Sequence, residues 1–109
     1  MGTRKSAVFS ETENELAELA KALGHPARIA ILKELATRNV CVCGEIVDTL
    51  PLAQSTVSQH LKELKAAGLI LGTVEGVKSC YCINWAAVER LKTLLDDFLK
   101  PGPGQNCAC

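Results

Sequence analysis

The fold is decided by residues 40–71, which read VCVCGEIVDTLPLAQSTVSQHLKELKAAGLIL. A short apolar segment is interrupted at Pro51, and an α-helix is predicted over Gln54–Ala67. The large apolar residues of that helix follow the spacing i, i+4, i+7, and they are Val57, Leu61 and Leu64. This spacing places them on one face, so the helix is predicted to bury that face against the rest of the protein.

The opposite face of the same helix carries small, hydrogen-bonding or basic side chains, which are Ser55, Ser58, Gln59 and Lys62. Such side chains suit a helix that lies in the DNA major groove and contacts phosphates and base edges. The alternative is an ordinary amphipathic helix whose polar face is solvated. The order of elements favours DNA binding, because a short helix, a turn, a Ser/Thr/Gln-rich helix and a β-hairpin form a winged helix-turn-helix.

Three segments resemble the ArsR/SmtB family of metal-sensing repressors: KALGHPARIAILKEL (21–35), AQSTVSQHLKELKAAGLI (53–70) and GTVEGVKSCYCIN (72–84). The resemblance extends from about Leu16 to Leu99. It implies a mainly α fold with a β-hairpin wing (α+β), that is, a homodimeric winged helix-turn-helix that binds double-stranded operator DNA. The implied DNA contacts are Gln54, Ser55, Thr56, Ser58, Gln59, His60, Lys62 and Lys78.

Chain length and composition indicate one globular domain, because 109 residues are too few for two and 48% of them are hydrophobic. Residues 1–9 are expected to form a flexible arm, residues 10–100 the DNA-binding and dimerisation domain, and residues 101–109 a flexible tail with two cysteines. Twelve basic and twelve acidic residues cancel, whereas DNA-binding proteins are usually basic. A local basic stripe near Lys62, Lys65 and Lys78 is compatible with this neutral total.

No apolar run approaches the length of about 18 residues that a membrane span needs, and the first residues lack a signal-peptide core. We therefore expect a cytoplasmic protein without a membrane partner. A reducing compartment disfavours a structural disulfide framework. An enzyme is not indicated, since neither an acid/base pair nor a phosphate-binding loop is recognisable.

Sequence signals for helix starts occur both before and after residues 40–71. Ser10–Glu13 has the S-x-x-E spacing of a capping box, and Pro26 suits the first turn of a helix that is apolar nearly all round. His25 and Arg28 at that start are expected to serve as cap or surface residues rather than as DNA contacts. Asn84 is a suitable N-cap for the last helix.

Two further elements are expected on either side of the predicted helix Gln54–Ala67. A short helix is predicted from the cysteine segment, over Val42–Leu50. The wing is predicted as a hairpin of Leu69–Val74 and Lys78–Ile83 around a turn at Glu75–Gly76.

The last helix carries a wide apolar stripe that repeats at intervals of three and four residues. Packing of this helix against the rest of the same chain explains part of the stripe. A surface that contacts a second protein chain would explain its full width. The family resemblance implies that the first and last helices form the homodimer. The predicted interface residues are Leu16, Leu19, Leu23, Val88, Leu91, Leu95 and Phe98.

All six cysteines occur in Cys-x-Cys pairs, which are Cys41/Cys43, Cys80/Cys82 and Cys107/Cys109. Thiolates prefer soft metal ions, and a disulfide within Cys-x-Cys would be strained. A helix start at the first pair would lower the cysteine pKa. For the second pair, alternation on the strand allows chelation, but the preferred explanation is a face of the wing that carries small side chains.

The segment VCVCGEI (40–46) resembles the cysteine segment of the arsenic-responsive branch of the family. Cys41 and Cys43 are therefore the predicted ligands, and Cys107 and Cys109 are further candidates. Members of that branch can carry another cysteine where this chain has Ile46, so the local segment supplies two sulfurs rather than three.

The resulting hypothesis is a repressor that releases its operator when As(III), Sb(III) or an organoarsenical binds these thiolates, without an organic cofactor. Two alternatives remain open. One is a sensor of another soft metal, such as Cd, Pb or Cu, or of thiol oxidation. The other is a thiol-rich metal-binding or arsenical-carrier protein whose DNA-binding motif no longer regulates transcription.

Overall fold

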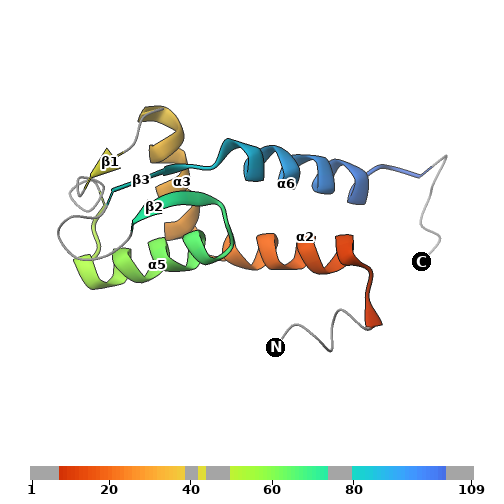
Figure 1. The fold of residues 1–109 in the computed structure, drawn as a ribbon, viewed down its shortest axis with the longest axis horizontal. Helices are drawn as coiled ribbons and strands as arrows, with labels where there is room; N and C mark the ends of the chain where they lie inside the picture. The colour runs from red at the N-terminus through yellow and green to blue at the C-terminus, as the bar shows by residue number, and fades with distance from the viewer. Residues whose placement is uncertain (1–7, 39–41, 44–49, 74–79, 103–109) are drawn as a thin grey trace, which may run out of the picture.

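The structure, a computed structural model, describes residues 8–38, 42–43, 50–73 and 80–102. Within this part of the chain it contains four α-helices and a small antiparallel sheet (Figure 1). The helices are α2 (Glu11–Ala22), α3 (Pro26–Arg38), α5 (Gln54–Ala66) and α6 (Trp85–Phe98), and the strands are β1 (Val42–Cys43), β2 (Ile70–Thr73) and β3 (Cys80–Ile83). The mainly α fold with a β wing is confirmed.

The predicted helix caps are present. The backbone N–H of Glu13 donates to Ser10 Oγ at 3.1 Å, and the backbone N–H of Ser10 donates to Glu13 Oε1 at 3.0 Å, which completes the capping box of α2. At the start of α6, the Asn84 side chain accepts from the N–H of Ala87 at 3.4 Å. Its amide also donates to the carbonyl of Gly68 at 2.9 Å, so one side chain joins the end of α5 to the start of α6.

The sheet has the strand order β1-β3-β2, and both strand pairs are antiparallel. The close approach of β2 to β3 depends on Gly72, which has φ 120°, because a Cβ there would collide with the carbonyl oxygen of Cys80. The predicted strands of the wing are confirmed over Ile70–Thr73 and Cys80–Ile83. The predicted turn at residues 75–76 lies outside the described residues.

The prediction of a helix beginning at Val42 is wrong. Val42 and Cys43 form β1 instead, opposite Tyr81 and Cys80 of β3 respectively. The physical reason is tertiary pairing: a free edge of β3 offers hydrogen-bond partners, and β-branched valine fits an extended backbone well. Residues 44–49 lie outside the described part, and Leu50 is not helical.

The core lies where α3, α5 and the sheet meet. The side chains with at most 2% of their surface exposed are Ile31, Leu35, Val57, Leu61, Leu64, Leu69, Ile70 and Tyr81. The buried stripe predicted for α5 is thus confirmed. It holds the helix against α3 and β2, which fixes the direction in which the opposite face of α5 points.

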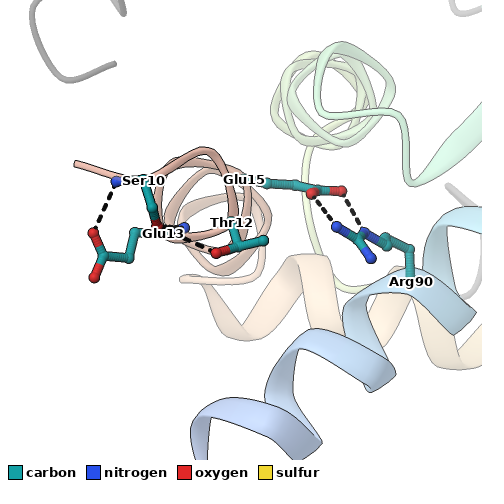
Figure 2. A network of polar contacts seen from close by, with 5 residues as sticks. All are labelled: Ser10, Thr12, Glu13, Glu15 and Arg90. Atoms are coloured by element: carbon teal, nitrogen blue, oxygen red, sulfur yellow. Dashed lines mark hydrogen bonds and ion pairs between the residues drawn. The ribbon is translucent and has the colours of Figure 1, made fainter. Parts of the chain in front are cut away.

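Helices α2 and α6 lie side by side and form a second layer (Figure 1). Figure 2 shows the polar link between them: the Arg90 guanidinium on α6 donates from Nε to Glu15 Oε2 at 2.9 Å and from a terminal nitrogen to Oε1 at 2.8 Å. This paired geometry lowers the pKa of Glu15 and raises that of Arg90, chiefly through the hydrogen bonds. None of the helices in the described residues is both long and apolar enough to span a bilayer.

Candidate DNA interface and thiol site

The outward face of α5 is polar and open to solvent. Among the predicted DNA contacts on this face, Ser58 is half-buried. The exposed ones are Gln54, Ser55, Thr56, Gln59 and Lys62. The Gln59 amide donates to Glu63 Oε2 at 3.2 Å, which is a solvent-exposed contact that DNA binding can replace. Helix α5 begins at Gln54 without a side-chain cap, so its first backbone N–H groups carry the positive end of the helix dipole. The arrangement suits contact with phosphates and base edges.

His60 differs from the other predicted DNA contacts, because it is buried with 8% of its surface exposed. Its Nδ1 accepts a hydrogen bond from Arg28 Nε at 3.1 Å, and its ring lies 4.3 Å from the ring of His25 between centroids. Arg28 also donates to the carbonyl of Ala22 at 3.3 Å. We therefore assign His60 to the docking of α5 on the start of α3 and the end of α2, in place of a base or phosphate contact.

This docking contact requires a neutral imidazole at His60. Burial lowers the pKa of His60 below its ordinary value of 6.5, and the nearby His25 and Arg28 lower it further, while Glu63 acts in the opposite direction. A neutral ring leaves Nδ1 free to accept from Arg28. His25 has the capping role expected of it, since its own Nδ1 accepts from the N–H of Ala27 at 3.0 Å.

The thiol site is seen in part. The sheet register sets Cys43 on β1 directly opposite Cys80 on β3. Five side chains of the predicted sites lie outside what the structure describes, and they are those of Cys41, Cys43, Lys78, Cys107 and Cys109. The predicted roles of these five residues therefore stay predictions.

The second Cys-x-Cys pair lies on β3 next to the core. Tyr81 between the two cysteines is 1% exposed, whereas Cys80 and Cys82 are half-buried. Alternation along the strand places Tyr81 on one face and the two cysteines on the other. Cys80 takes part in a disulfide. This bond was not expected, because a reducing compartment disfavours structural disulfides. No group of three or more His, Cys, Asp or Glu suited to a metal ion occurs among the described side chains.

The predicted dimer residues lie along the α2–α6 layer. Leu19 and Leu91 are buried within the chain, at 7% and 8% exposure, and Phe98 is 67% exposed. The four other predicted interface residues, Leu16, Leu23, Val88 and Leu95, are half-buried against the core. The stripe is thus divided between residues that pack inside the chain and Phe98, which is exposed, and the dimer interface stays a prediction.

Comparisons with known proteins agree with this architecture. A helix-turn-helix domain model matches residues 23–73, which include α3 and α5. An HTH-type transcriptional regulator of Methanocaldococcus jannaschii is 40% identical over 89 residues, which cover 81% of this chain and 99% of that protein. The HTH-type transcriptional repressor SmtB of Mycobacterium tuberculosis is 48% identical over 64 residues, covering 59% of this chain and 47% of that protein. The chain belongs to the ArsR/SmtB family of transcriptional regulators.

Solved structures support the family assignment. An ArsR-like transcriptional regulator from Rhodococcus superposes with a TM-score of 0.65 at 27% identity, covering 80% of this chain and 81% of that one. The cadmium metal-sensor CMTR from Mycobacterium tuberculosis superposes with a TM-score of 0.54 at 35% identity, covering 86% of this chain and 97% of that one. These likenesses include the winged-helix core, and the relatives named above are transcriptional regulators.

Sequence reasoning missed two features of this site. The position of His60 was available from the sequence, since it falls three residues after Val57 and four before Leu64, on the buried stripe. The alignment of Cys43 with Cys80 was not available, because strand register depends on pairing between distant segments.

Proposed function

We propose that this ArsR/SmtB-family protein is a cytoplasmic, homodimeric repressor that leaves its operator when trivalent arsenic or antimony binds the thiolates of Cys41 and Cys43. The inducer is arsenite, antimonite or an organoarsenical. The observation that carries the proposal is the position of β1: the strand that contains Cys43 precedes α5 in the chain and is hydrogen-bonded to the wing. A ligand at this segment therefore acts close to the DNA-reading elements.

The DNA side of the proposal is supported by the two faces of α5. The inner face is almost completely buried, so the helix has one orientation, and the outer face offers Gln59, Lys62 and several hydroxyl groups to solvent. Phosphate contacts from Lys62 would position the protein, and Gln59 would read a base edge.

Dimerisation is supported by the apolar surface that one chain leaves exposed at the end of the α2–α6 layer. Phe98 and Leu99 are 67% and 65% exposed, and Phe9 just before α2 is 52% exposed. A second copy that covers this surface would also bring two α5 helices into one assembly, as a two-fold symmetric operator requires.

The mechanism is thermodynamic linkage between ligand and DNA. Arsenic(III) supplies positions at which thiolate sulfurs replace oxygen, and the ligand stabilises the conformer in which the Cys43 segment adopts the ligand-bound arrangement. Release of DNA requires that this conformer presents α5 less favourably to the operator. A coupling free energy of roughly 1–3 kcal/mol would weaken operator affinity about 5- to 150-fold.

The test is a DNA-binding titration with the fully reduced dimer and the DNA upstream of its own coding sequence. Arsenite, antimonite and phenylarsine oxide should each release the DNA from the wild-type protein. Cys41→Ser should keep wild-type affinity for DNA and lose the response to all three ligands. Normal release in that variant would place the sensing site elsewhere, and unresponsive wild-type protein would refute arsenic sensing altogether.

Cadmium sensing is a second candidate, favoured by the 35% identity with the cadmium metal-sensor CMTR. Cadmium is a soft ion that thiolates also bind. The same titration with CdCl₂ separates the candidates: release at a lower concentration of Cd(II) than of arsenite, abolished in Cys41→Ser, would make cadmium the inducer.

A further inference from the structure

His60 is the one buried residue among those the structure describes that can change its charge near neutral pH. It is 8% exposed and lies between Val57 and Leu64 on the stripe by which α5 packs against the protein. Histidine is the side chain whose ordinary pKa lies between pH 5 and 8, and the whole sequence contains two histidines, His25 and His60. Changes in histidine charge in this pH range therefore come from these two residues.

The hydrogen bond between Arg28 and His60 requires a neutral imidazole. Arg28 Nε lies 3.1 Å from His60 Nδ1, and a guanidinium N–H can only donate. His60 Nδ1 must therefore be unprotonated. A proton on this nitrogen would set two donors and two positive charges against each other across the contact between α3 and α5.

The groups that face His60 give a positive charge on its ring little compensation. Arg28 on α3 and His25 just before α3 both disfavour that charge, and the two histidine rings lie 4.3 Å apart between centroids. Glu63 on α5 favours it, but Glu63 is exposed and already accepts a hydrogen bond from Gln59. Protonation of His60 in place is therefore unfavourable.

A cavity of about 370 Å³ lies beside this contact, where α2, α3 and α5 meet. Arg28 and Glu63 line it together with Glu18 and Lys21 of α2, whose opposite charges offset each other. Strand β2, which also packs on α5, has no charged residue. His60 itself does not line the cavity, so a charged ring reaches this water only by leaving its place in the packed stripe.

We infer that acidification releases the protein from its operator, because a proton on His60 loosens α5 from α3 and the DNA-reading face loses its fixed orientation. His60 is then a positioning residue, which acts through α5 and its sequence neighbour Gln59 rather than through a contact with DNA. The inference rests on the DNA binding by α5 in the proposed function, and it does not require the thiol ligand. Protons and trivalent arsenic are two separate inputs to one repressor.

The sign of this effect is opposite to the ordinary effect of acid on a DNA-binding protein. Protonation of an exposed histidine, such as His25, adds a positive charge and strengthens attraction to phosphates. Protonation of buried His60 weakens binding, because DNA favours the conformer in which the ring is neutral. Burial and the neighbouring cations lower the pKa of His60, so the loss of affinity begins below about pH 6.5. Its slope is at most about tenfold per pH unit for each His60.

The test is operator binding by the reduced wild-type protein between pH 7.5 and 5.0, measured by fluorescence anisotropy at constant ionic strength. The dissociation constant should rise about fivefold or more on acidification and should recover when the pH is restored. His60→Gln keeps an acceptor for Arg28 but cannot be protonated. Its dissociation constant, relative to its own value at pH 7.5, should stay constant or fall.

His25→Asn is the matched control, because asparagine is also a good N-cap for α3 and the substitution removes the other titrating ring. This variant should keep the acid-induced loss of affinity. The inference is overturned if the loss persists in His60→Gln, is absent from the wild type or disappears in His25→Asn. Circular dichroism is recorded at each pH, and a loss of helix content in step with operator affinity would identify acid denaturation instead.

Nuclear magnetic resonance gives a second readout that needs no DNA. At pH 7.5 the Arg28 Nε–H should give a hydrogen-bonded signal, and this signal should be lost on acidification with the midpoint of the His60 ring titration. In His60→Gln it should persist over the whole range. Loss of operator affinity while the Arg28 signal of the wild type persists would overturn the inference.

The outcomes also separate this inference from the proposed function. Wild-type protein that releases its operator in acid but ignores arsenite, antimonite and phenylarsine oxide would refute the thiol part of the proposed function and support the proton switch. Protein that responds to arsenite but binds its operator equally at every pH would refute the proton switch alone. Protein that binds no operator at pH 7.5 would refute both.

Discussion

The winged half of the molecule and the α2–α6 layer differ in how completely one chain buries them. In the winged half the core residues from α3, α5 and the sheet are at most 2% exposed. In the α2–α6 layer the most buried apolar residues, Leu19, Ala22, Leu91 and Leu94, keep 5–8% of their surface exposed. The large apolar residues Phe98 and Leu99 lie at the end of this layer and are mostly exposed. The difference indicates that the winged half is complete within one chain, while the helical layer has surface left for a partner.

The largest effect is expected from a matched pair of leucine truncations. Leu64→Ala removes a side chain with 0% exposure from the winged core and should lower the free energy of unfolding by about 3–5 kcal/mol. Leu91→Ala, at 8% exposure, should cost about 2 kcal/mol in dilute protein, near the lower end of the range for such truncations.

Urea unfolding at two protein concentrations checks this pair. The deficit of Leu91→Ala should grow with concentration if a second chain covers the helical layer, because dimer formation then contributes to stability. The deficit of Leu64→Ala should not. Equal deficits at every concentration would remove the distinction between the two halves.

The helical layer is tested directly by Leu95→Asp. Leu95 is half-buried and packs on the edge of the core, so a second chain that covers it would enclose an unpaired carboxylate, which is costly. The variant should sediment as a monomer at micromolar concentration, whereas Thr93→Asp on the exposed side of α6 should remain dimeric. Persistence of a full dimer in Leu95→Asp would exclude this face as the interface.

The two halves also differ in how well the sequence predicted them. The buried stripe of α5 and the caps at Ser10 and Asn84 were predicted because they depend on periodicity and on neighbours a few residues away. Strand β1 was missed because it consists of two residues and exists only through its pairing with β3. The helix was predicted from the expected order of elements in a winged helix-turn-helix, and pairing with β3 replaced its first residues by a strand.

The candidate site follows the same division. The spacing predicted the exposure of Ser55, Gln59 and Lys62, whose contacts with DNA stay predictions. Ser58 is half-buried, and His60 lies on the buried stripe. Cysteine spacing identified three pairs but not their relation in space, since register and not sequence distance brings Cys43 to Cys80. The roles of Cys107 and Cys109 stay a prediction, because these residues lie outside the described part of the chain.

Within the winged half, substitutions on the outer face of α5 should affect DNA binding without affecting stability. Gln59→Ala should weaken operator binding by about 1–3 kcal/mol if its amide reads a base edge, and discrimination against altered operators should fall. Lys62→Ala should weaken binding to all sequences alike and make the salt dependence less steep. Fluorescence anisotropy with operator and scrambled DNA separates the two effects, and wild-type affinity in both variants would mean that another face of the protein contacts DNA.

The smallest effect concerns the inner face of α5 and arises from one proton. The pKa of His60 is lowered in the folded protein, mainly by burial and then by His25 and Arg28, so the unfolded chain binds a proton at higher pH than the folded chain does. The contribution of neutral His60 to stability is therefore fully present above about pH 6.5. It is lost as pH falls below this value towards the lowered pKa, with a slope of at most about one proton per chain. His60→Gln keeps an acceptor for Arg28 but cannot titrate, so the difference between its unfolding free energy and that of the wild type should change with pH in this window. Urea unfolding between pH 7.5 and 5.5 measures that difference. If the difference in unfolding free energy does not change with pH, protonation of His60 does not weaken the packing of α5 against α3.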